Sequence, residues 1–310
     1  MDSLRLRQMT AEDQSEVSEL IYASINTWYG LRGMGQPFQG SPQVTEVFYQ
    51  VYSGIRTSRC VVAENSRTSR LMGSCFYHPR RSHVGLGIMT VHPNYFGFGA
   101  GREMLQYICD FTDREGYSAL RLTQSALNLD SFSLYNRAGF VPYQAYQDMT
   151  LQVPESGLEQ PPPGLKQVRD ATLEDVPAMA ALELQVSGVT REEDYRFCIE
   201  NSLGFWHVSV YESAPGNIEG FLVSSAHPVF NMLGPGVMKT QEQAAPLIFS
   251  ELNLHRGQSP ILILPVDQSQ LVQLMYIWGA RNCELHFCQV RGKFQRYQGI
   301  NMPTFLLETA

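Results

Sequence analysis

Apolar positions along the chain recur with two alternating periods, that of short strands and that of amphipathic helices. Three short apolar runs are typical of buried strands, at residues 59–63, 71–77 and 87–91. A helix predicted over residues 102–115 places four apolar side chains on one face, Met104, Leu105, Ile108 and Phe111. With a first strand and helix before them and closing strands from residues 141–151, these elements predict an α/β fold. Its sheet is mixed and mostly antiparallel, and helices flank it.

The pattern that opens the chain returns 162 residues later. A strand-like run meets a threonine helix cap, and an acid follows three residues on as in a capping box. The repeated residues are Arg7, Thr10, Glu12 and Asp13 in the first copy and Arg169, Thr172, Glu174 and Asp175 in the second. Strand–cap–helix openings are common, but the shared offset predicts an internal duplication.

A proline-rich segment, Val153 to Gly164, separates the two copies. Consecutive prolines favour an extended, semi-rigid spacer. We therefore predict a first domain over residues 1–152, a linker over 153–164 and a second domain over 165–310.

Composition excludes several classes of protein. The 310 residues are 44% hydrophobic and 17% charged, which excludes a largely disordered chain. The net charge of -7 disfavours a broad nucleic-acid-binding face. No run approaches the roughly 20 apolar residues of a membrane helix, and the six cysteines form no CxxC pair. We expect a cytoplasmic monomer or homodimer with no nucleic-acid or membrane partner and no metal.

A glycine-rich turn joins the strand at 87–91 to the helix at 102–115. Gly97, Gly99 and Gly101 alternate there. Glycines allow positive φ angles and close approach of a ligand, and a helix N-terminus attracts anions. The spacing matches neither the dinucleotide fingerprint nor the P-loop. A diphosphate site and a merely tight turn both remain open on these residues alone.

Two motifs in sequence order give the first domain a family resemblance. The first is Val91-x-Pro93-x-x-x-Gly97-x-Gly99-x-Gly101, and the second is Asn128-x-x-Ser131-x-x-Leu134-Tyr135-x-x-x-Gly139-Phe140. Together they resemble the GNAT superfamily of acyl-CoA-dependent N-acetyltransferases over about residues 3–152. Phe96 stands where that family usually has Arg or Gln, and Ser131 where Ala is more usual.

The resemblance implies acetyl-CoA as cofactor and a role for each matching residue. Tyr135 would give a proton to the departing CoA thiolate, although a tyrosine on a short helix is also a common core residue. The backbone of Met89 and Val91 would pair with the pantetheine arm. The implied cofactor-binding residues are Met89, Thr90, Val91, Phe96, Gly97, Phe98, Gly99, Ala100, Gly101, Arg102, Asn128, Ser131 and Tyr135.

The acceptor pocket and the general base are less defined. The segment 26–38 mixes aromatic residues with glycines, and Trp28 and Tyr29 are the candidate substrate-binding residues. A packed loop is the equal alternative. His83 and Glu64 are weighed as bases acting through water, but a solvated surface role is favoured for each, as it is for His78. No base is assigned.

The second half repeats the strand plan but departs at both motifs. No alternating triple glycine follows Leu233-Gly234-Pro235-Gly236, and Tyr276 is out of register with Tyr135. We therefore predict tandem GNAT-like domains with a degenerate C-terminal copy. The expected activity is transfer of an acetyl group to the primary amine of a small acceptor. An acyl-CoA sensor or interaction module and a protein N-acetyltransferase are the alternatives.

Overall fold

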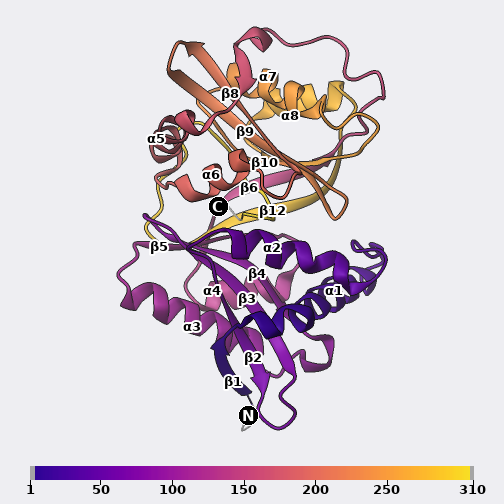
Figure 1. Ribbon diagram of the computed structural model, residues 1–310, viewed down its shortest axis with the longest axis vertical. Coiled ribbons are helices and arrows are strands. Elements are labelled where there is room, and N and C mark those ends of the chain that lie inside the picture. Colours follow the sequence, from indigo (N-terminus) through magenta and orange to yellow (C-terminus); the bar gives the residue numbers. More distant parts are fainter. Residues whose placement is uncertain (1–3, 308–310) are drawn as a thin grey trace. The chain divides into compact units, whose positions relative to one another are not determined.

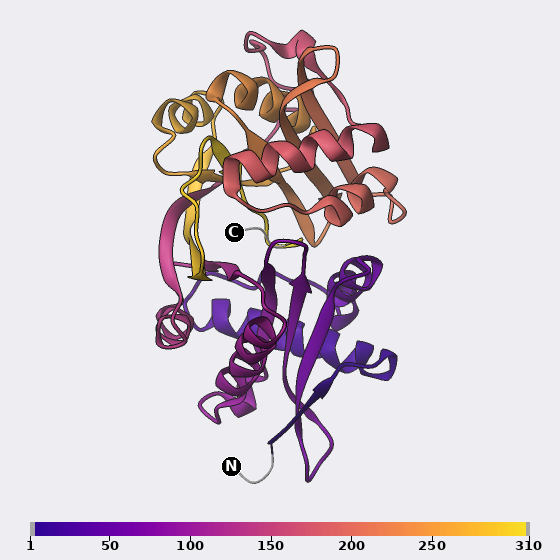
Figure 2. The ribbon, with the colours of Figure 1, turned by 90° about the vertical axis from the view of Figure 1, so that its left-hand side faces the viewer.

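The computed structural model describes residues 4–307. The chain divides at Leu120 into two compact units (Figures 1 and 2). Strand β5 (Ala119–Ser125) crosses the division. Each unit is described by itself.

The first unit is a four-stranded antiparallel sheet with helices packed on it. Its elements are β1 (Leu4–Gln8), α1 (Gln14–Gly30), α2 (Glu46–Gly54), β2 (Arg59–Asn65), β3 (Leu71–Pro79), β4 (Val84–Val91) and α3 (Ala100–Arg114). The strands pair in chain order, and each pair is antiparallel. Helices α1 and α3 both contact β3, which is buried along its whole length. The strands expected at 59–63, 71–77 and 87–91 are confirmed.

The second unit is a larger mixed sheet with helices on it. Its elements are α4 (Leu129–Arg137), β6 (Val141–Thr150), β7 (Val168–Asp170), α5 (Val176–Ser187), α6 (Glu192–Glu200), β8 (Trp206–Ala214), β9 (Asn217–His227), β10 (Phe230–Met238), α7 (Gln241–Leu252), β11 (Ile261–Pro265), α8 (Ser269–Ile277), β12 (Arg281–Gly292) and β13 (Ile300–Met302).

The strands of this unit follow the order β12-β6-β11-β10-β9-β8-β7. The pairs are antiparallel apart from β10 and β11, which run parallel. The mixed, mostly antiparallel sheet flanked by helices is therefore the predicted fold class.

Strand β6 and the linker are not arranged as expected for two consecutive, separate domains. β6, which chain order places in the predicted first domain, pairs with β11 and β12 of the second unit. The linker begins as a packed segment: Val153 is fully buried, its N–H donates to the Gln258 carbonyl, and its carbonyl accepts from the Gly257 N–H. A boundary at residue 152 stays a prediction, because the compact units divide at a different point.

The repeated N-terminal motif adopts one geometry twice. Arg7 donates to both oxygens of Asp13 at 2.6 and 2.8 Å, and Arg169 to both oxygens of Asp175 at 2.8 Å each. In both copies the acid also accepts the N–H of the threonine cap at 2.8 Å. The arginine of each copy reaches a second acid on the neighbouring strand, Glu64 at 2.7 Å and Glu212 at 2.8 Å. The predicted tandem organisation is thus present in the contacts as well as in the sequence.

Candidate functional site

The glycine turn of the first unit ends in a helix whose N-terminus has no side-chain cap. Gly97 has a φ of 82° and Gly99, the residue that caps α3, a φ of 84°. The first intrahelical bond of α3 runs from the Glu103 N–H to the Gly99 carbonyl. The N–H groups of the first turn precede this bond, as at the N-terminus of any α-helix. An added Cβ at Gly97 would meet no atom within 4 Å, so the space beside the loop is open. These are the properties of an anion-binding turn.

Strand β4 leads into this turn with alternating exposure. Thr90 is buried and its hydroxyl lies 3.1 Å from that of Ser74 on β3. Met89 and Val91, on either side of it, are only partly buried. Val91 lies opposite Gly73 of β3, where a Cβ would come within 2.8 Å of the Thr90 carbonyl oxygen. The backbone that the resemblance assigns to pantetheine pairing is therefore held in place by tight β3–β4 packing.

Two aromatic residues of the turn are exposed. Phe96 is 44% exposed and Phe98 is 62% exposed, and the Phe98 ring meets Tyr95 edge-on at 6.2 Å. Phe96, which replaces the usual polar residue, thus contributes apolar surface beside the loop rather than a hydrogen-bonding side chain.

Helix α4 of the second unit carries the remaining predicted cofactor residues. Asn128 caps it, accepting the Ser131 N–H at 3.1 Å. Tyr135 is buried, with 6% of its surface exposed, and its ring lies 5.6 Å from that of Phe140. Asn128 therefore has a structural role that the sequence motif alone does not reveal.

The candidate substrate residues lie at the end of α1. Trp28 and Tyr29 meet edge-on at 4.8 Å, and the Arg32 guanidinium lies 4.0 Å from the centre of the Trp28 ring. The segment that follows is pinned: Asn26 donates to the Phe38 carbonyl and accepts the Phe38 N–H at 2.9 and 3.0 Å. Phe38 itself is buried. Residues 31–37, between these two points, are all exposed, so the bonds hold the ends of the segment and both interpretations of residues 26–38 stay open.

Glu64 and His83, the two candidate general bases, do not lie on a solvated surface. Glu64 is held by Arg7, while His83 is 2% exposed, with its Nδ1 3.0 Å from the Ser82 hydroxyl. His78 is fully buried, with its Nδ1 2.8 Å from the Ser58 hydroxyl. The expectation of solvated histidines was wrong, because β3 and its hairpin are covered on both faces.

The second copy lacks the loop altogether. Eight residues, His92 to Gly99, separate β4 from α3, whereas only Lys239 and Thr240 separate β10 from α7. Thr240 caps α7 in a capping box with Gln243, and its hydroxyl also donates to the Glu242 carboxylate. A carboxylate and side-chain caps thus occupy the position where an anion would bind in the first unit.

The second copy also lacks the tyrosine. The bond from the Phe140 N–H to the Tyr135 carbonyl has its counterpart in the bond from the Ala280 N–H to the Met275 carbonyl. Met275, which is fully buried, therefore stands where Tyr135 stands. Tyr276 is 48% exposed and donates to Gln147, so its predicted shift in register agrees with the helix geometry.

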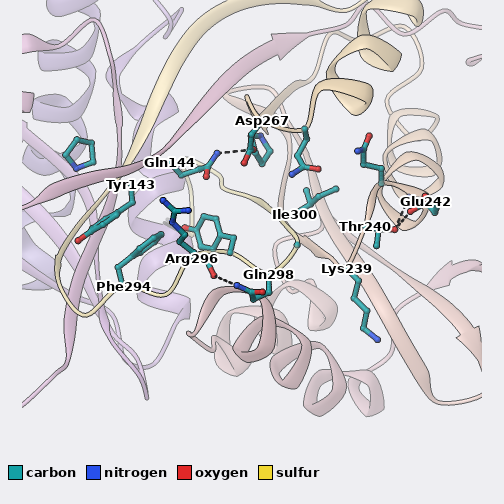
Figure 3. Close-up of a pocket in the computed structure, with 16 residues that line it drawn as sticks. Tyr143, Gln144, Lys239, Thr240, Glu242, Asp267, Phe294, Arg296, Gln298 and Ile300 are labelled. Atoms are coloured by element: carbon teal, nitrogen blue, oxygen red, sulfur yellow. Dashed lines mark hydrogen bonds between the residues drawn. The ribbon is translucent and has the colours of Figure 1, made fainter.

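A cavity of about 1000 Å³ lies in the second unit at the ends of β10 and β11 (Figure 3). Its wall combines charged, amide and aromatic side chains, including Tyr143, Lys239, Glu242, Asp267, Phe294 and Arg296. Tyr143 and Phe294 stack at 4.1 Å. No sequence motif indicates this cavity, because its wall comes from four separate segments.

A second cavity, of about 450 Å³, lies in the first unit between α1 and the start of the turn. Glu16, Arg70, His92 and Tyr95 are among its lining residues. Arg70 and Glu16 pair at 2.9 Å, so part of its charge is neutralised internally. Trp28 and Tyr29 do not line it.

Three side chains of the second unit converge as metal ligands do, although their sequence spacing gave no such signal. The ligand atoms of Asp148, Glu284 and His286 lie within 4.8 Å of one another. His286 Nδ1 lies 2.9 Å from Asp148, and the Ser125 hydroxyl donates to Glu284. These bonds account for the cluster without an ion.

No helix within residues 4–307 combines the length and hydropathy needed to cross a membrane.

Comparisons with known proteins identify the fold and one domain. Residues 28–140 match the model of the acetyltransferase (GNAT) family. No curated protein matches the chain. A putative acetyltransferase from Pyrococcus horikoshii is 14% identical, with a TM-score of 0.74 over 99% of this chain and 93% of that one.

Two further solved structures share the fold across most of the chain. A GCN5-related N-acetyltransferase from Sphaerobacter thermophilus is 15% identical, with a TM-score of 0.62 over 96% of this chain and 98% of that one. A tandem GNAT protein from the clavulanic acid biosynthesis pathway is 12% identical, with a TM-score of 0.60 over 93% and 98%. At such low identity these structures establish the tandem fold and no more.

Proposed function

We propose that this chain, whose N-terminal half carries a GNAT-family domain within a tandem GNAT fold, moves an acetyl group from acetyl-CoA to the primary amine of a small acceptor. The uncapped N-terminus of α3 behind two glycines of positive φ is the observation that carries the proposal. Acetyl-CoA supplies a thioester carbonyl that the amine attacks directly, so that a C–N bond forms as the C–S bond breaks.

Different parts of the chain bind different parts of acetyl-CoA. The first-turn N–H groups of α3 hold the pyrophosphate, since they point out of the helix and carry its positive dipole end. The β4 backbone at Met89 and Val91 pairs with the amide-bearing pantetheine arm. Exposed Phe96 and Phe98 offer apolar surface beside the pyrophosphate.

Two protons move in the reaction. Tyr135 donates its phenolic proton to the leaving thiolate, because a phenol with an ordinary pKa of about 10 can protonate a thiolate of similar basicity. The attacking amine loses its proton to solvent, in keeping with the engagement of Glu64 by Arg7 and of His83 by Ser82.

Thermal unfolding tests cofactor binding. Saturating acetyl-CoA stabilises a chain that binds it, by about 2.7 kcal/mol at a hundredfold excess over Kd. An unchanged melting temperature would exclude the transferase and the sensor together. Release of free thiol, measured against a panel of small amines, then identifies the acceptor class.

A non-catalytic acyl-CoA sensor is the second candidate, favoured by Phe96 at the usual polar position and by the lack of an assigned base. Binding of acetyl-CoA without thiol release across the panel would support it. Acetylation of a protein N-terminus or lysine is the third, in keeping with the net charge of -7 and a basic acceptor. Thiol release with basic peptides but not with small amines would select it. In each case we expect a cytoplasmic monomer or homodimer that engages neither nucleic acid nor membrane.

A further inference from the structure

The C-terminal strand β13 adds itself to β10 inside the second unit. Its residues Ile300 to Met302 run antiparallel to Met238 to Gly236. β10 and β11 pair with each other only at the start, through Met232 and Leu233. β13 pairs with β10 beyond that point and also contacts β11, so it fills the space where the two parallel strands diverge. Figure 3 shows Ile300 between Thr240 at the end of β10 and Asp267 beyond β11.

The place that β13 occupies has a direct counterpart in the first unit. Val91 of β4 lies opposite Gly73, and Met238 of β10 lies opposite Gly220, the matching glycine of the second copy. Met238 and Gly236 therefore correspond to Val91 and Met89. Those are the two residues whose backbone the proposed function assigns to the pantetheine arm. In the second unit the partners of these positions are Ile300 and Met302.

The segment is packed as part of the core. Ile300 and Met302 are 1% and 0% exposed and belong to the apolar cluster that includes Leu233 and Leu264. Asn301 between them is also buried, and its amide donates to the Ser187 hydroxyl at 3.0 Å.

Gly299 on the C-terminal segment and Gly234 on β10 allow the segment to lie very close to β10. A Cβ at Gly299 would lie 2.5 Å from the Met238 carbonyl oxygen, and one at Gly234 would lie 2.6 Å from the Pro303 carbonyl oxygen. Gly234, which lies where the sequence suggested a degraded phosphate turn, is instead inside β10 and serves this contact. At these separations no second chain of atoms fits between β10 and the C-terminal segment.

We propose that residues 299–303 permanently occupy the acyl-CoA groove of the second copy, so that each chain binds one acyl-CoA, at the first copy, and the groove between β10 and β11 binds none. The inference rests on the proposed function only for the site in the first copy. The docked strand is a property of the second unit alone.

Amide hydrogen exchange tests the docked strand without any ligand. The amides of residues 300–302 and 236–238 should exchange slowly and should stay protected when acetyl-CoA is added. Rapid exchange in the free protein, or deprotection by acetyl-CoA, would overturn the proposal. A chain that binds no acetyl-CoA at all would refute the proposed function, while the exchange in the free protein would still decide the docked strand.

A reversible crosslink tests the stoichiometry. In a Cys283→Ser background, which removes the exposed thiol, Met238→Cys with Ile300→Cys places two thiols on partnered positions. Equilibrium dialysis should give one acetyl-CoA per chain for the wild type and for the oxidised and reduced variant, with Kd values within about twofold. Two per chain in the wild type or the reduced variant, falling to one on oxidation, would show that the strand is displaced by ligand. A variant that fails to fold leaves the wild-type stoichiometry to decide.

Discussion

Nδ1 of His207 on β8 lies 3.0 Å from Oε1 of Glu251 on α7, a carboxylate with no exposed surface. The other Glu251 oxygen accepts the Ser224 hydroxyl at 2.6 Å, and Nε2 of His207 lies 3.3 Å from Asp170. The bond to Glu251 is the main reason that the pKa of His207 is raised above its ordinary value of 6.5; Asp170 adds to the shift, and burial opposes it. Burial is the main cause of the lowered pKa of the neighbouring His255, and His207 lowers it further.

The raised pKa predicts a stability that falls with increasing pH. The contribution of His207 is fully present below about pH 6.5 and is lost as pH rises through the higher pKa of the folded state. Because the side chain is half-buried, we expect about 1 kcal/mol between pH 6 and pH 8.5. Urea unfolding should show this slope in the wild type and a flatter profile in His207→Gln. His92→Gln serves as the control, because the Nδ1 of His92 accepts a backbone N–H and does not face a carboxylate. Parallel profiles for wild type and His207→Gln would contradict the prediction.

Tyr135→Phe should lower turnover while leaving acetyl-CoA affinity nearly unchanged. Loss of a general acid typically reduces the rate by about 10²–10⁴-fold. The ring contact with Phe140 survives the substitution, so stability should change little. Tyr276→Phe, at the exposed and shifted position of the second copy, should keep full turnover. Equal losses of binding and turnover in Tyr135→Phe would assign the tyrosine to packing.

Gly97→Val should weaken acetyl-CoA binding by at least tenfold. Valine at a φ of 82° costs about 1–3 kcal/mol of strain, which the exposed loop relieves by moving its N–H groups. Gly116→Val is a matched control, since Gly116 has a φ of 76° at the other end of α3 and equally open surroundings. Both variants should lose stability, and calorimetric titration should find weakened binding only in Gly97→Val. Similar affinity in the two would remove the turn from the proposed site.

Asp175→Asn should destabilise the chain at neutral pH and much less in acid. Arg169 is the main cause of the lowered pKa of Asp175, and the N–H and hydroxyl of Thr172 lower it further. The contribution of the carboxylate is present above its ordinary pKa of 3.8 and is lost as pH falls. Loss of the capping box predicts about 1 kcal/mol at pH 7 by denaturant unfolding.

Asp13→Asn provides the internal comparison, because Arg7 and Thr10 make the same contacts with it. Exposed Glu193→Gln should have little effect. A cost for Asp175→Asn that is the same at pH 3 and pH 7 would show that packing, not ionisation, carries it.

Local patterns predicted the first copy well. The Arg–Asp and Thr–Asp contacts of each N-terminal motif join residues at most six apart, so their spacing alone predicts the capping box, whereas the second acid bound by each arginine lies on a distant strand. The same holds for Gly97 and Gly99, whose positive φ is a property of a short turn.

Features that depend on residues far away in the chain could not be predicted from the sequence. His78 and His83 looked solvated, yet the covering of β3 buries them. Gly234 and Gly236 resembled a remnant turn, but glycine at 234 is explained by its positive φ of 131° and by the close approach of Pro303. The pairing of β6 with β11 and β12 likewise joins segments more than 100 residues apart.

The two-residue connection between β10 and α7 has a consequence for the history of the chain. A site lost through one substitution can be regained by reverting it. Restoring the acyl-CoA site of the second copy would require an insertion of about six residues between β10 and α7 and a tyrosine at position 275. It would also require removal of β13, whose Ile300 and Met302 belong to the core. Each intermediate would lose stability before gaining any ligand. Regaining a cofactor site in the second copy would therefore cost folding free energy at each of these steps.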